Sequence, residues 1–343
     1  MNDTLTIFPP EALEKAAHIA DVLRAHDDYI ICAHAAMDGD ALGSLAAMGH
    51  LLHTLGKRFL LYSATGMPAY LDWLPLPAHL HTKLSPLPFQ PRTALILDCG
   101  EAHRTGEEMA ALLPPAAQAL PCINLDHHRG NPHFGTLANW VEPDYAATAQ
   151  LVAYIARAAD IELSGPLAEA IGLALLTDTG GFAHGNTSPQ VLALAAHLSA
   201  LGLDFSRLRE ELNNQWSGRR MRLWGKLMQD IALHREGSVA FTAIPYTLFE
   251  ESGTTKEDLE GFVEMMRRLK GVKATIMLRD DAPKLCKVSL RSSGTVDVRV
   301  AAATLGGGGH TNAAGGTLRM PLTQASAAIL QAVCVELDAE ENK

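Results

Sequence analysis

The stretch CAHAAMDGDALGS, residues 32–44, places one histidine and two aspartates directly after an apolar run that is typical of a β-strand. His34, Asp38 and Asp40 offer nitrogen and oxygen ligands, and carboxylates that are brought close together repel one another. A bound cation would explain why these groups converge. Taken alone, Asp38 and Asp40 are equally explained as caps of the following helix, which is a frequent use of aspartate.

Three further segments end an apolar run with aspartate or histidine. They are LILDCG with Asp98, INLDHH with Asp126, His127 and His128, and LLTDTGG with Asp178. Two adjacent histidines after a single strand are often a structural pair, so none of these segments is decisive alone. Four such segments in one part of the chain favour a single shared site.

The ligand types indicate which cation this site would take. Imidazole nitrogens and carboxylate oxygens without thiolates suit Mn²⁺, with Mg²⁺, Co²⁺ or Zn²⁺ as competitors. The ligands are too many for one ion, whereas a bridging carboxylate accommodates two ions roughly 3.5–4 Å apart. Such an ion pair commonly serves displacement reactions at phosphorus.

A glycine run followed by histidine, GGGGH at 306–310, is the second local signal. Glycine lets backbone N–H groups approach an anion closely. Upstream, VSLRSS at 288–293 ends a strand-like run with an arginine, whose planar fork suits phosphate. A flexible turn and a solvent-exposed arginine are the alternative explanations. The candidate substrate-binding residues are Arg291, Ser292, Gly307, Gly308, Gly309 and His310.

The elements that must position the acidic and histidine residues alternate along the chain. From about residue 10 to 200, short β-rich runs such as YIICAH, RFLLYS, TALILDC and PCINLDHH alternate with helical patterns. This alternation predicts a parallel sheet with flanking helices. Ligands of such sheets gather beyond the carboxyl ends of the strands, where the polar segments fall.

The rest of the chain predicts a linker and a smaller α/β domain. Residues 189–235 are helical in pattern and rich in charge. Four strand-like runs follow, GSVAFTAIP, GVKATIMLRD, KLCKVSLRSS and VDVRVAAATL, with a helix expected over 255–271 and another at the C-terminus. We therefore expect an α/β protein with a parallel-sheet N-terminal domain at 10–188, a helical linker at 189–235 and a C-terminal domain at 236–343.

Composition narrows the class of protein. The formal net charge of −10 argues against a basic surface that coats nucleic acid, so a polyanionic substrate must be met by metal ions or a local group of arginines. Five cysteines without CxxC spacing are expected to be reduced core residues. With neither a signal sequence nor a long apolar run in evidence, we expect a cytoplasmic protein that does not bind membranes.

Together these motifs resemble the DHH phosphoesterase superfamily, in particular its two-domain branch with a DHH-associated C-terminal domain, the NrnA-type oligoribonuclease/pAp phosphatases. The likeness covers roughly residues 20–320. It rests on the order and spacing of His-x-x-x-Asp-x-Asp at 34–40, Asp-x-Gly at 98–100, DHH at 126–128 followed by NPHFG, TDTG at 177–180, VSLRS at 288–292 and GGGGH at 306–310.

The resemblance implies a role for each residue. One Mn²⁺ would be held by His34, Asp38 and Asp98. The other would be held by Asp40, Asp98, His127 and Asp178, with Asp98 bridging. His128 would lie beside the scissile phosphate, and Asp126 would orient its neighbours. Arg291, His310 and the glycine backbone would bind a substrate phosphate from the second domain, across an interdomain cleft.

The function implied by the resemblance is hydrolysis of short RNA oligonucleotides and linear dinucleotides to mononucleotides, together with dephosphorylation of pAp, and not attack on long duplex nucleic acid. Thr311, Ser293 and Ala183 stand where relatives often carry basic or amide side chains, which thins the basic lining. Cyclic-di-AMP hydrolysis is the alternative activity. A nucleotide-binding sensor without catalysis is the alternative class, although intact ligand positions argue against it. A homodimer is left open.

Overall fold

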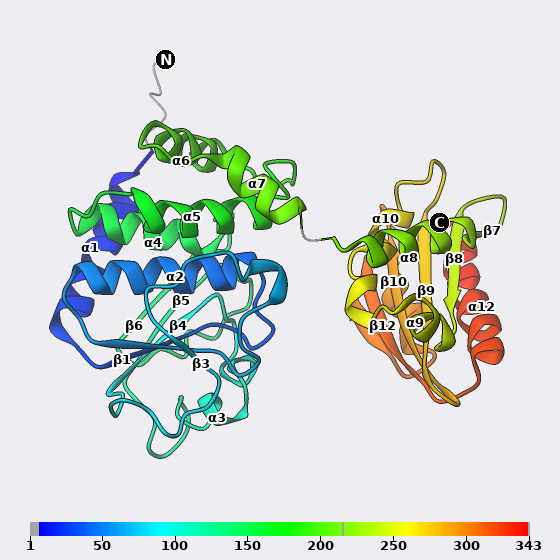
Figure 1. The fold of residues 1–343 in the computed structure, drawn as a ribbon, viewed down its shortest axis with the longest axis horizontal. Helices are drawn as coiled ribbons and strands as arrows, with labels where there is room; N and C mark the ends of the chain where they lie inside the picture. Colours follow the sequence, from blue (N-terminus) through cyan, green and yellow to red (C-terminus); the bar gives the residue numbers. More distant parts are fainter. Residues whose placement is uncertain (1–6, 215, 342–343) are drawn as a thin grey trace. The chain divides into compact units, whose positions relative to one another are not determined.

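The computed structural model describes residues 7–214 and 216–341, and its contacts divide the chain into two compact units, Met1–Gln215 and Trp216–Lys343 (Figure 1). The first unit is built on a six-stranded parallel sheet of order β3-β2-β1-β4-β5-β6. Its strands are β1 (Tyr29–Cys32), β2 (Phe59–Tyr62), β3 (Leu80–His81), β4 (Thr93–Leu97), β5 (Cys122–Asp126) and β6 (Ala138–Val141).

Helices and shorter segments bury both faces of this sheet. Every residue of β1, β4 and β5 is buried, which explains why these strands are continuous apolar runs without alternation. Figure 1 shows α2, α4 and α5 on one side and α3 on the other. The helices of this unit are α1 (Pro10–Ala25), α2 (Gly39–Thr54), α3 (Glu107–Ala110), α4 (Thr148–Ala158), α5 (Gly165–Asp178), α6 (Pro189–Ala200) and α7 (Phe205–Asn213).

Two glycines let α2 and α5 pack in direct contact. A Cβ at Gly43 would lie 2.5 Å from the backbone oxygen of Ala170, and a Cβ at Gly39 would lie 2.7 Å from Cβ of Thr177. No larger residue fits either position without moving a helix. This close packing brings the beginning of α2 beside the end of α5.

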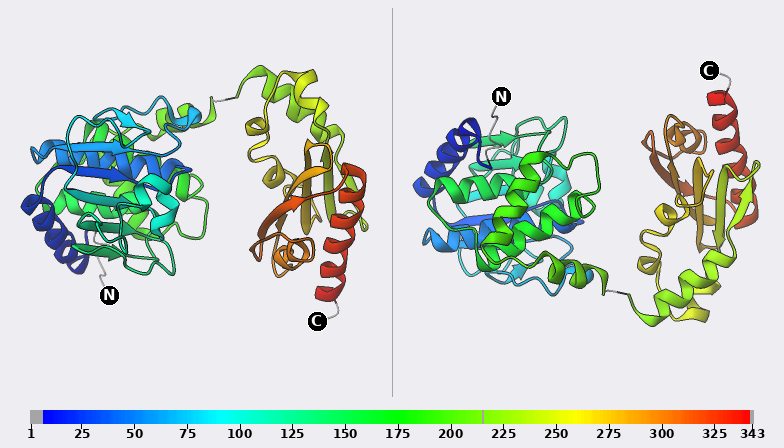
Figure 2. Two further views of the ribbon diagram at one scale, coloured as in Figure 1. Left: turned by 90° about the horizontal axis from the view of Figure 1, so that it is seen from below. Right: turned by 90° about the horizontal axis from the view of Figure 1, so that it is seen from above.

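The second unit has a mixed six-stranded sheet of order β11-β12-β10-β9-β8-β7, in which only the β8–β9 pairing is parallel. Figure 2 shows α12, in red, lying along this sheet. The strands are β7 (Ala232–His234), β8 (Val239–Ile244), β9 (Ala274–Ala282), β10 (Leu285–Ser292), β11 (Gly308–His310) and β12 (Ala313–Leu318). The helices are α8 (Gly218–Gln229), α9 (Thr247–Ser252), α10 (Phe262–Met266), α11 (Val298–Ala303) and α12 (Leu322–Glu341).

The structure confirms the predicted fold class and corrects two local predictions. The run VDVRVAAATL, predicted as a strand, forms helix α11, because Asp297 accepts a hydrogen bond from the Arg299 N–H and Val298, Ala301 and Ala302 form one buried face. The single helix predicted over 255–271 is divided into a 3₁₀ turn, Lys256–Leu259, and α10, because Gly261 takes a φ of 83° between them.

The segment 189–235, expected as one linker, is shared between the two units. Helices α6 and α7 belong to the first unit, and α8 belongs to the second. A Cβ at Gly172 of α5 would lie 2.5 Å from the Leu203 side chain and 2.9 Å from that of Leu208, so α7 and the turn before it pack closely on α5. Within the described residues no single helix is long and apolar enough to span a membrane, although α6 and α7, bent by 104°, pass that test as a pair.

The space around two glycines predicts opposite effects of an added methyl group. Gly43 lies in the α2–α5 contact, and Gly225 lies in α8. We expect Gly43→Ala to lower the free energy of unfolding of the first unit by about 1–3 kcal/mol, because the new methyl group overlaps a backbone oxygen. Gly225→Ala in α8, where no atom lies within 4 Å of the added Cβ, should instead stabilise the second unit by roughly 0.5–1 kcal/mol. Urea unfolding followed by circular dichroism measures both, and an unaltered first unit in Gly43→Ala would contradict the packing argument.

Candidate metal centre

The topology brings polar residues from three strand ends to one edge of the parallel sheet. Strands β1, β4 and β5 are neighbours, and they lead into His34, Asp98 and His127 respectively. Asp40 lies in the first turn of α2, and Asp178 is the last residue of α5. The close α2–α5 packing therefore adds two carboxylates to the strand-end groups.

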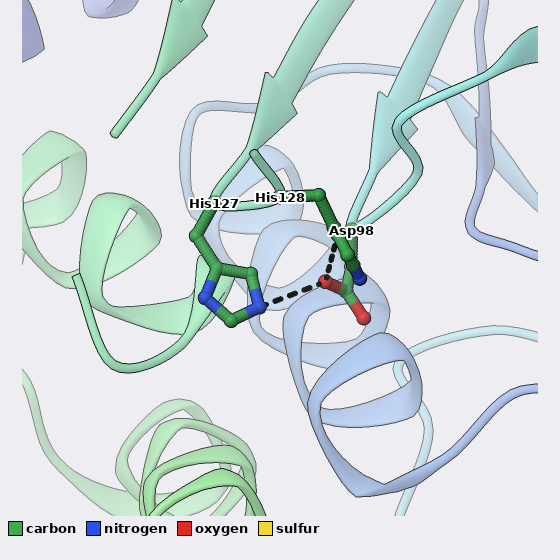
Figure 3. A group of neighbouring side chains, drawn as sticks. All are labelled: Asp98, His127 and His128. Carbon is green, nitrogen blue, oxygen red and sulfur yellow. Dashed lines mark ion pairs between the residues drawn. The ribbon is translucent and has the colours of Figure 1, made fainter. Parts of the chain in front are cut away.

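Asp98 lies at the centre of this group, and Figure 3 shows it beside His127 and His128. Its Oδ1 is 3.4 Å from Nε2 of His127 and 3.5 Å from Nδ1 of His128, and its Oδ2 is 3.6 Å from Nε2 of His34. The backbone of Asp98 has a φ of 51°, in the left-handed region that side chains with a Cβ seldom adopt. The fold tolerates this strain of about 1–3 kcal/mol at a residue whose carboxylate touches three imidazoles.

A second group of ligands surrounds His127. Its Nε2 lies 3.5 Å from Oδ2 of Asp40 and 3.4 Å from Oδ2 of Asp178. His34 Nε2 lies 3.8 Å from Oδ2 of Asp38. Among the described residues, three groups have ligand atoms that all lie within 4.8 Å of one another: His34, Asp38 and Asp98; Asp40, His127 and Asp178; Asp98, His127 and His128.

Hydrogen bonds outside these groups orient the ligands as a metal requires. Nδ1 of His127 lies 3.1 Å from the backbone oxygen of Tyr145. In the neutral ring that can bind a metal, the N–H at Nδ1 donates to that oxygen and the lone pair is on Nε2, the atom that faces three carboxylates. Atoms bound at about 2.1 Å to one ion lie on the order of 3–4 Å apart, so the observed spacings fit divalent ions held by these residues.

The beginning of α4 supplies partners that the sequence analysis missed. The carboxylate of Asp40 accepts hydrogen bonds from the N–H of Thr148 at 2.6 Å, the N–H of Ala149 at 3.1 Å and the hydroxyl of Ser44 at 2.9 Å. The Thr148 hydroxyl donates to Oδ1 of Asp98 at 3.1 Å. Thr148 thus holds the carboxylates of Asp40 and Asp98 in place. In the sequence, this role is indicated by nothing more than its position at the start of a helix.

Asp126 and His128 form a separate pair beside the metal ligands. Nδ1 of His128 lies 2.7 Å from Oδ1 of Asp126, and the amide of Asn131 donates to Oδ2 of Asp126 at 2.7 Å. Asn131 was not predicted as part of the site, although it lies in the NPHFG stretch that follows DHH. With Nδ1 engaged, the other nitrogen of the His128 ring is free to meet a ligand.

Burial and crowding shift the pKa values of the group. Burial raises the pKa of Asp40 far above its usual range, with the charges of Asp98 and Asp178 adding to the effect. Burial likewise raises the pKa of Asp178 to about 6. Burial opposes the charged form of His34 and of His127, but hydrogen-bonded carboxylates raise the pKa to about 9 for His34 and to about 10 for His127.

Within residues 7–214 and 216–341, the histidines are the charged partners of these carboxylates. Among the described residues, no lysine or arginine forms an ion pair with Asp38, Asp40, Asp98, Asp126 or Asp178. Without metal the site is held by protonated imidazoles, and a divalent cation would replace those protons.

The substrate-binding candidates lie in the second unit. Arg291 on β10 and His310 on β11 are both paired with Ala313 of β12, so they share one register two strands apart. Arg291 lines a cavity of about 610 Å³ together with Arg279 and Lys256, and its Nε lies 2.6 Å from the carboxylate of Glu264.

Two of the other candidates have local structural roles. Ser292 is fully buried, and its hydroxyl donates to the backbone oxygen of Val296 at 2.6 Å, so it shapes the loop after β10. Gly309 has a φ of 141°, and a Cβ there would lie 2.5 Å from the backbone oxygen of Ala313. Gly308 and His310 are exposed on β11, and a Cβ at Gly307 would lie 3.1 Å from the backbone oxygen of Ala302.

Comparisons with known proteins cover both units. A family model described as "DHH family, N-terminal domain" matches residues 28–177, and one described as "DHHA1 domain" matches residues 236–336. The chain is 34% identical over 331 residues to a bifunctional oligoribonuclease and PAP phosphatase NrnA of Thermus thermophilus, covering 96% of each chain.

Two solved structures extend the likeness. An exopolyphosphatase-related protein from Bacteroides fragilis superposes with a TM-score of 0.83 at 26% identity, over 96% of this chain and 97% of that one. The RecJ protein of Thermus thermophilus in complex with Mn²⁺ shares the fold, with a TM-score of 0.54 at 16% identity over 99% of this chain and 56% of that one.

The central position of Asp98 predicts its effect on metal content. We expect Asp98→Asn to lose nearly all affinity for divalent metal ions, because one carboxylate contacts ligands of both groups and the amide that replaces it carries no charge. Metal content after dialysis, measured by mass spectrometry, tests this. Asp144→Asn is the matched control, since Asp144 is exposed and pairs with Arg129. Full metal content in Asp98→Asn would rule out the bridging role.

The raised pKa values of His34 and His127 predict proton release on metal binding. Both imidazoles are protonated at pH 7 in the metal-free protein, with pKa values of about 9 and about 10, and must be neutral to bind an ion. Metal binding should therefore release at least two protons at pH 7, with Asp40, whose pKa is also raised far above its usual range, adding to the count, and affinity should rise as the pH is raised toward 9. Calorimetry in two buffers with different ionisation enthalpies counts these protons, and identical heats in both buffers would contradict the assignment.

Proposed function

The chain belongs to the DHH phosphoesterase family, and on that premise we propose that it hydrolyses short oligoribonucleotides and linear dinucleotides to mononucleotides and removes the 3′-phosphate of pAp, adenosine 3′,5′-bisphosphate. The observation that carries this proposal is the convergence of three imidazoles on the carboxylate of Asp98, with Asp40 and Asp178 beside them. The Thermus relative, whose name gives both activities, matches over nearly its whole length and supports the substrate class.

The metal ligands follow from the three groups of side chains. His34 and Asp38 would hold one ion and Asp40, His127 and Asp178 the other, with Asp98 shared between them. Two divalent ions bound there would supply positive charge to the phosphoryl oxygens and lower the pKa of water to near neutrality. Mn²⁺ is the ion we propose, because the donors are all oxygen and imidazole nitrogen and because a relative of the same fold is described in complex with it.

His128 is proposed to act directly on the substrate. The hydrogen bond to Asp126 raises the pKa of His128 and so favours its protonated form. A protonated ring donates a hydrogen bond to a phosphoryl oxygen, where negative charge grows during attack at phosphorus. Asp126, itself held by Asn131, is a positioning residue that fixes the orientation of this ring.

The second unit is proposed to bind the substrate through Arg291, His310 and the exposed glycine backbone of β11. The Arg291 guanidinium already pairs with Glu264, and a phosphate that accepts two hydrogen bonds from its fork would compete with that carboxylate. Ser292 would act from inside the unit by holding the loop after β10. The glycines at 307–309 would let backbone N–H groups approach a phosphate.

The preference for short substrates follows from charge. A long single strand is bound through a continuous basic groove with stacking aromatic residues, and its affinity depends on many phosphate contacts. This chain has ten more acidic than basic residues, 38 Asp and Glu against 28 Lys and Arg. A few local cations and the metal ions are enough for one or two phosphates, which favours di- and oligonucleotides.

Turnover on a substrate panel tests the proposal. We expect the metal-stripped protein, given Mn²⁺, to release mononucleotides from pApA, pGpG and a five-nucleotide RNA and phosphate from pAp, and to act slowly on a long single strand. Faster turnover of cyclic-di-AMP than of any linear member would make the chain a cyclic-dinucleotide phosphodiesterase. Tight binding of pAp with no turnover of any member would make it a sensor.

A further inference from the structure

An arginine from α7 lies directly on the loop that follows the metal ligand Asp178. A Cβ at Gly181 would lie 2.6 Å from Cζ of Arg209 and 2.9 Å from its Nη1, so the guanidinium occupies the space that any side chain at Gly181 would need. Gly181 has a φ of 71°, which also favours glycine. The loop therefore accommodates the Arg209 guanidinium at Gly181, three residues after Asp178.

The packing contacts of α7 place Arg209 against this loop. Phe205, the first residue of α7, meets Phe182 edge to face with ring centroids 5.7 Å apart. Arg209 lies four residues after Phe205, so both side chains project from one face of α7 toward the same loop. Leu208 is fully buried against α5 at Gly172, and Asp204 caps the helix with two hydrogen bonds.

The Arg209 guanidinium is exposed and has no partner in the part of the chain that the structure describes. It forms neither an ion pair nor a hydrogen bond there. Arg207, two residues earlier on the same helix, instead pairs with Glu169 at 2.6 Å. A guanidinium offers five donors, and those of Arg209 remain available to an anion from solution.

The end of α5 does not account for this arginine. A cation near a helix C-terminus interacts favourably with the helix dipole and often donates to the last carbonyl groups. Here those carbonyls already accept hydrogen bonds: Thr179 N–H donates to Leu175, Gly180 to Thr177 and Gly181 to Leu176, and the side chains of His184 and Asn186 donate to Asp178. Arg209 therefore lies beside this loop without donating a hydrogen bond to any group in the part of the chain that the structure describes.

His184 shapes the same loop. A Cβ at Gly180 would lie 2.6 Å from two carbons of the His184 ring, so this ring occupies the space beside a glycine with positive φ. Its Nδ1 donates to the backbone oxygen of Asp178 at 3.3 Å, and Nε2 is the ring atom nearest to Gly180. His184 therefore holds the loop, and Arg209 supplies the donors for an anion from solution.

We propose that Arg209 binds the phosphate group of the substrate that is not cleaved, namely the 5′-phosphate of pAp or of a 5′-phosphorylated dinucleotide. The inference rests on the proposed function for the identity of the substrate. A planar guanidinium takes two oxygens of one phosphate and discriminates a terminal phosphate from a hydroxyl. The scissile phosphate belongs at Asp98 and His128, whereas Arg209 approaches beyond Asp178, at the outer end of α5.

The experiment compares pApA with ApA, which differ only in the 5′-phosphate. For the wild-type protein with Mn²⁺ we expect a lower KM for pApA. Arg209→Ala should raise the KM for pApA about tenfold, as for loss of one charge-assisted pair, with a much smaller change for ApA, and Arg209→Lys should fall between. Arg207→Ala is the matched control, because it removes an arginine from the same helix that is already paired within the protein.

Two results would overturn the inference. One is a wild-type KM for pApA in Arg209→Ala. The other is an equal rise in KM for both dinucleotides, which would place Arg209 at the scissile phosphate or give it only a structural role. Circular dichroism confirms that the variants fold.

If the wild-type protein hydrolyses neither dinucleotide, the proposed function fails while the inference stays testable by calorimetry. Arg209→Ala should then still weaken the binding of pAp and leave that of adenosine 3′-phosphate nearly as in the wild type. Equal affinities for pAp in wild type and variant would reject the Arg209 site independently.

Discussion

The packing of carboxylates around Asp98 is the constraint on which the rest of the first unit depends. Asp40 and Asp98 are buried, with Asp178 partly buried beside them, and an isolated buried carboxylate costs several kcal/mol unless it is paired. Lysine and arginine, the usual partners, form no ion pair with them among the described residues. The protein therefore has to neutralise this charge with imidazoles, backbone N–H groups and the cations that such a site attracts.

Backbone geometry supplies much of that neutralisation. The first N–H groups of α4 point at the Asp40 carboxylate, so a helix N-terminus stabilises an almost fully buried acid. The carboxylate arrives there because Gly43 and Gly39 allow α2 to lie in contact with α5. The parallel order β1-β4-β5 delivers the histidines to the same edge. The fold and the site therefore depend on the same contacts. The glycines between α2 and α5 are as necessary for the site as the metal-binding residues themselves.

The sequence predicted those parts of the site that are local, and it missed those that arise from tertiary contact. Aspartate or histidine after an apolar run marks a strand end, so His34, Asp98 and His127 were recognisable. Thr148 and Asn131 are ordinary residues by type, and their roles depend on atoms that lie far away in sequence or across a turn. The prediction of a strand at 296–305 was wrong because V-D-V-R-V alternates like a strand, whereas the Asp297 cap and the alanines that follow stabilise a helix.

Charge placement connects the centre to its substrates. An acidic chain that handles anions gains affinity only where a cation is held still before the substrate arrives, because ordering a long side chain at the moment of binding costs about 0.5–1.5 kcal/mol. Arg207 and Arg209 differ in this respect although they share α7: the first is paired with Glu169, and the second lies against Gly181 with no ion pair or hydrogen bond among the described residues. A guanidinium that lies beside a divalent-ion site without such a partner adds affinity for one more phosphate but not for a long chain of them. The same few cations that make binding feasible would therefore also set the upper length of the substrate.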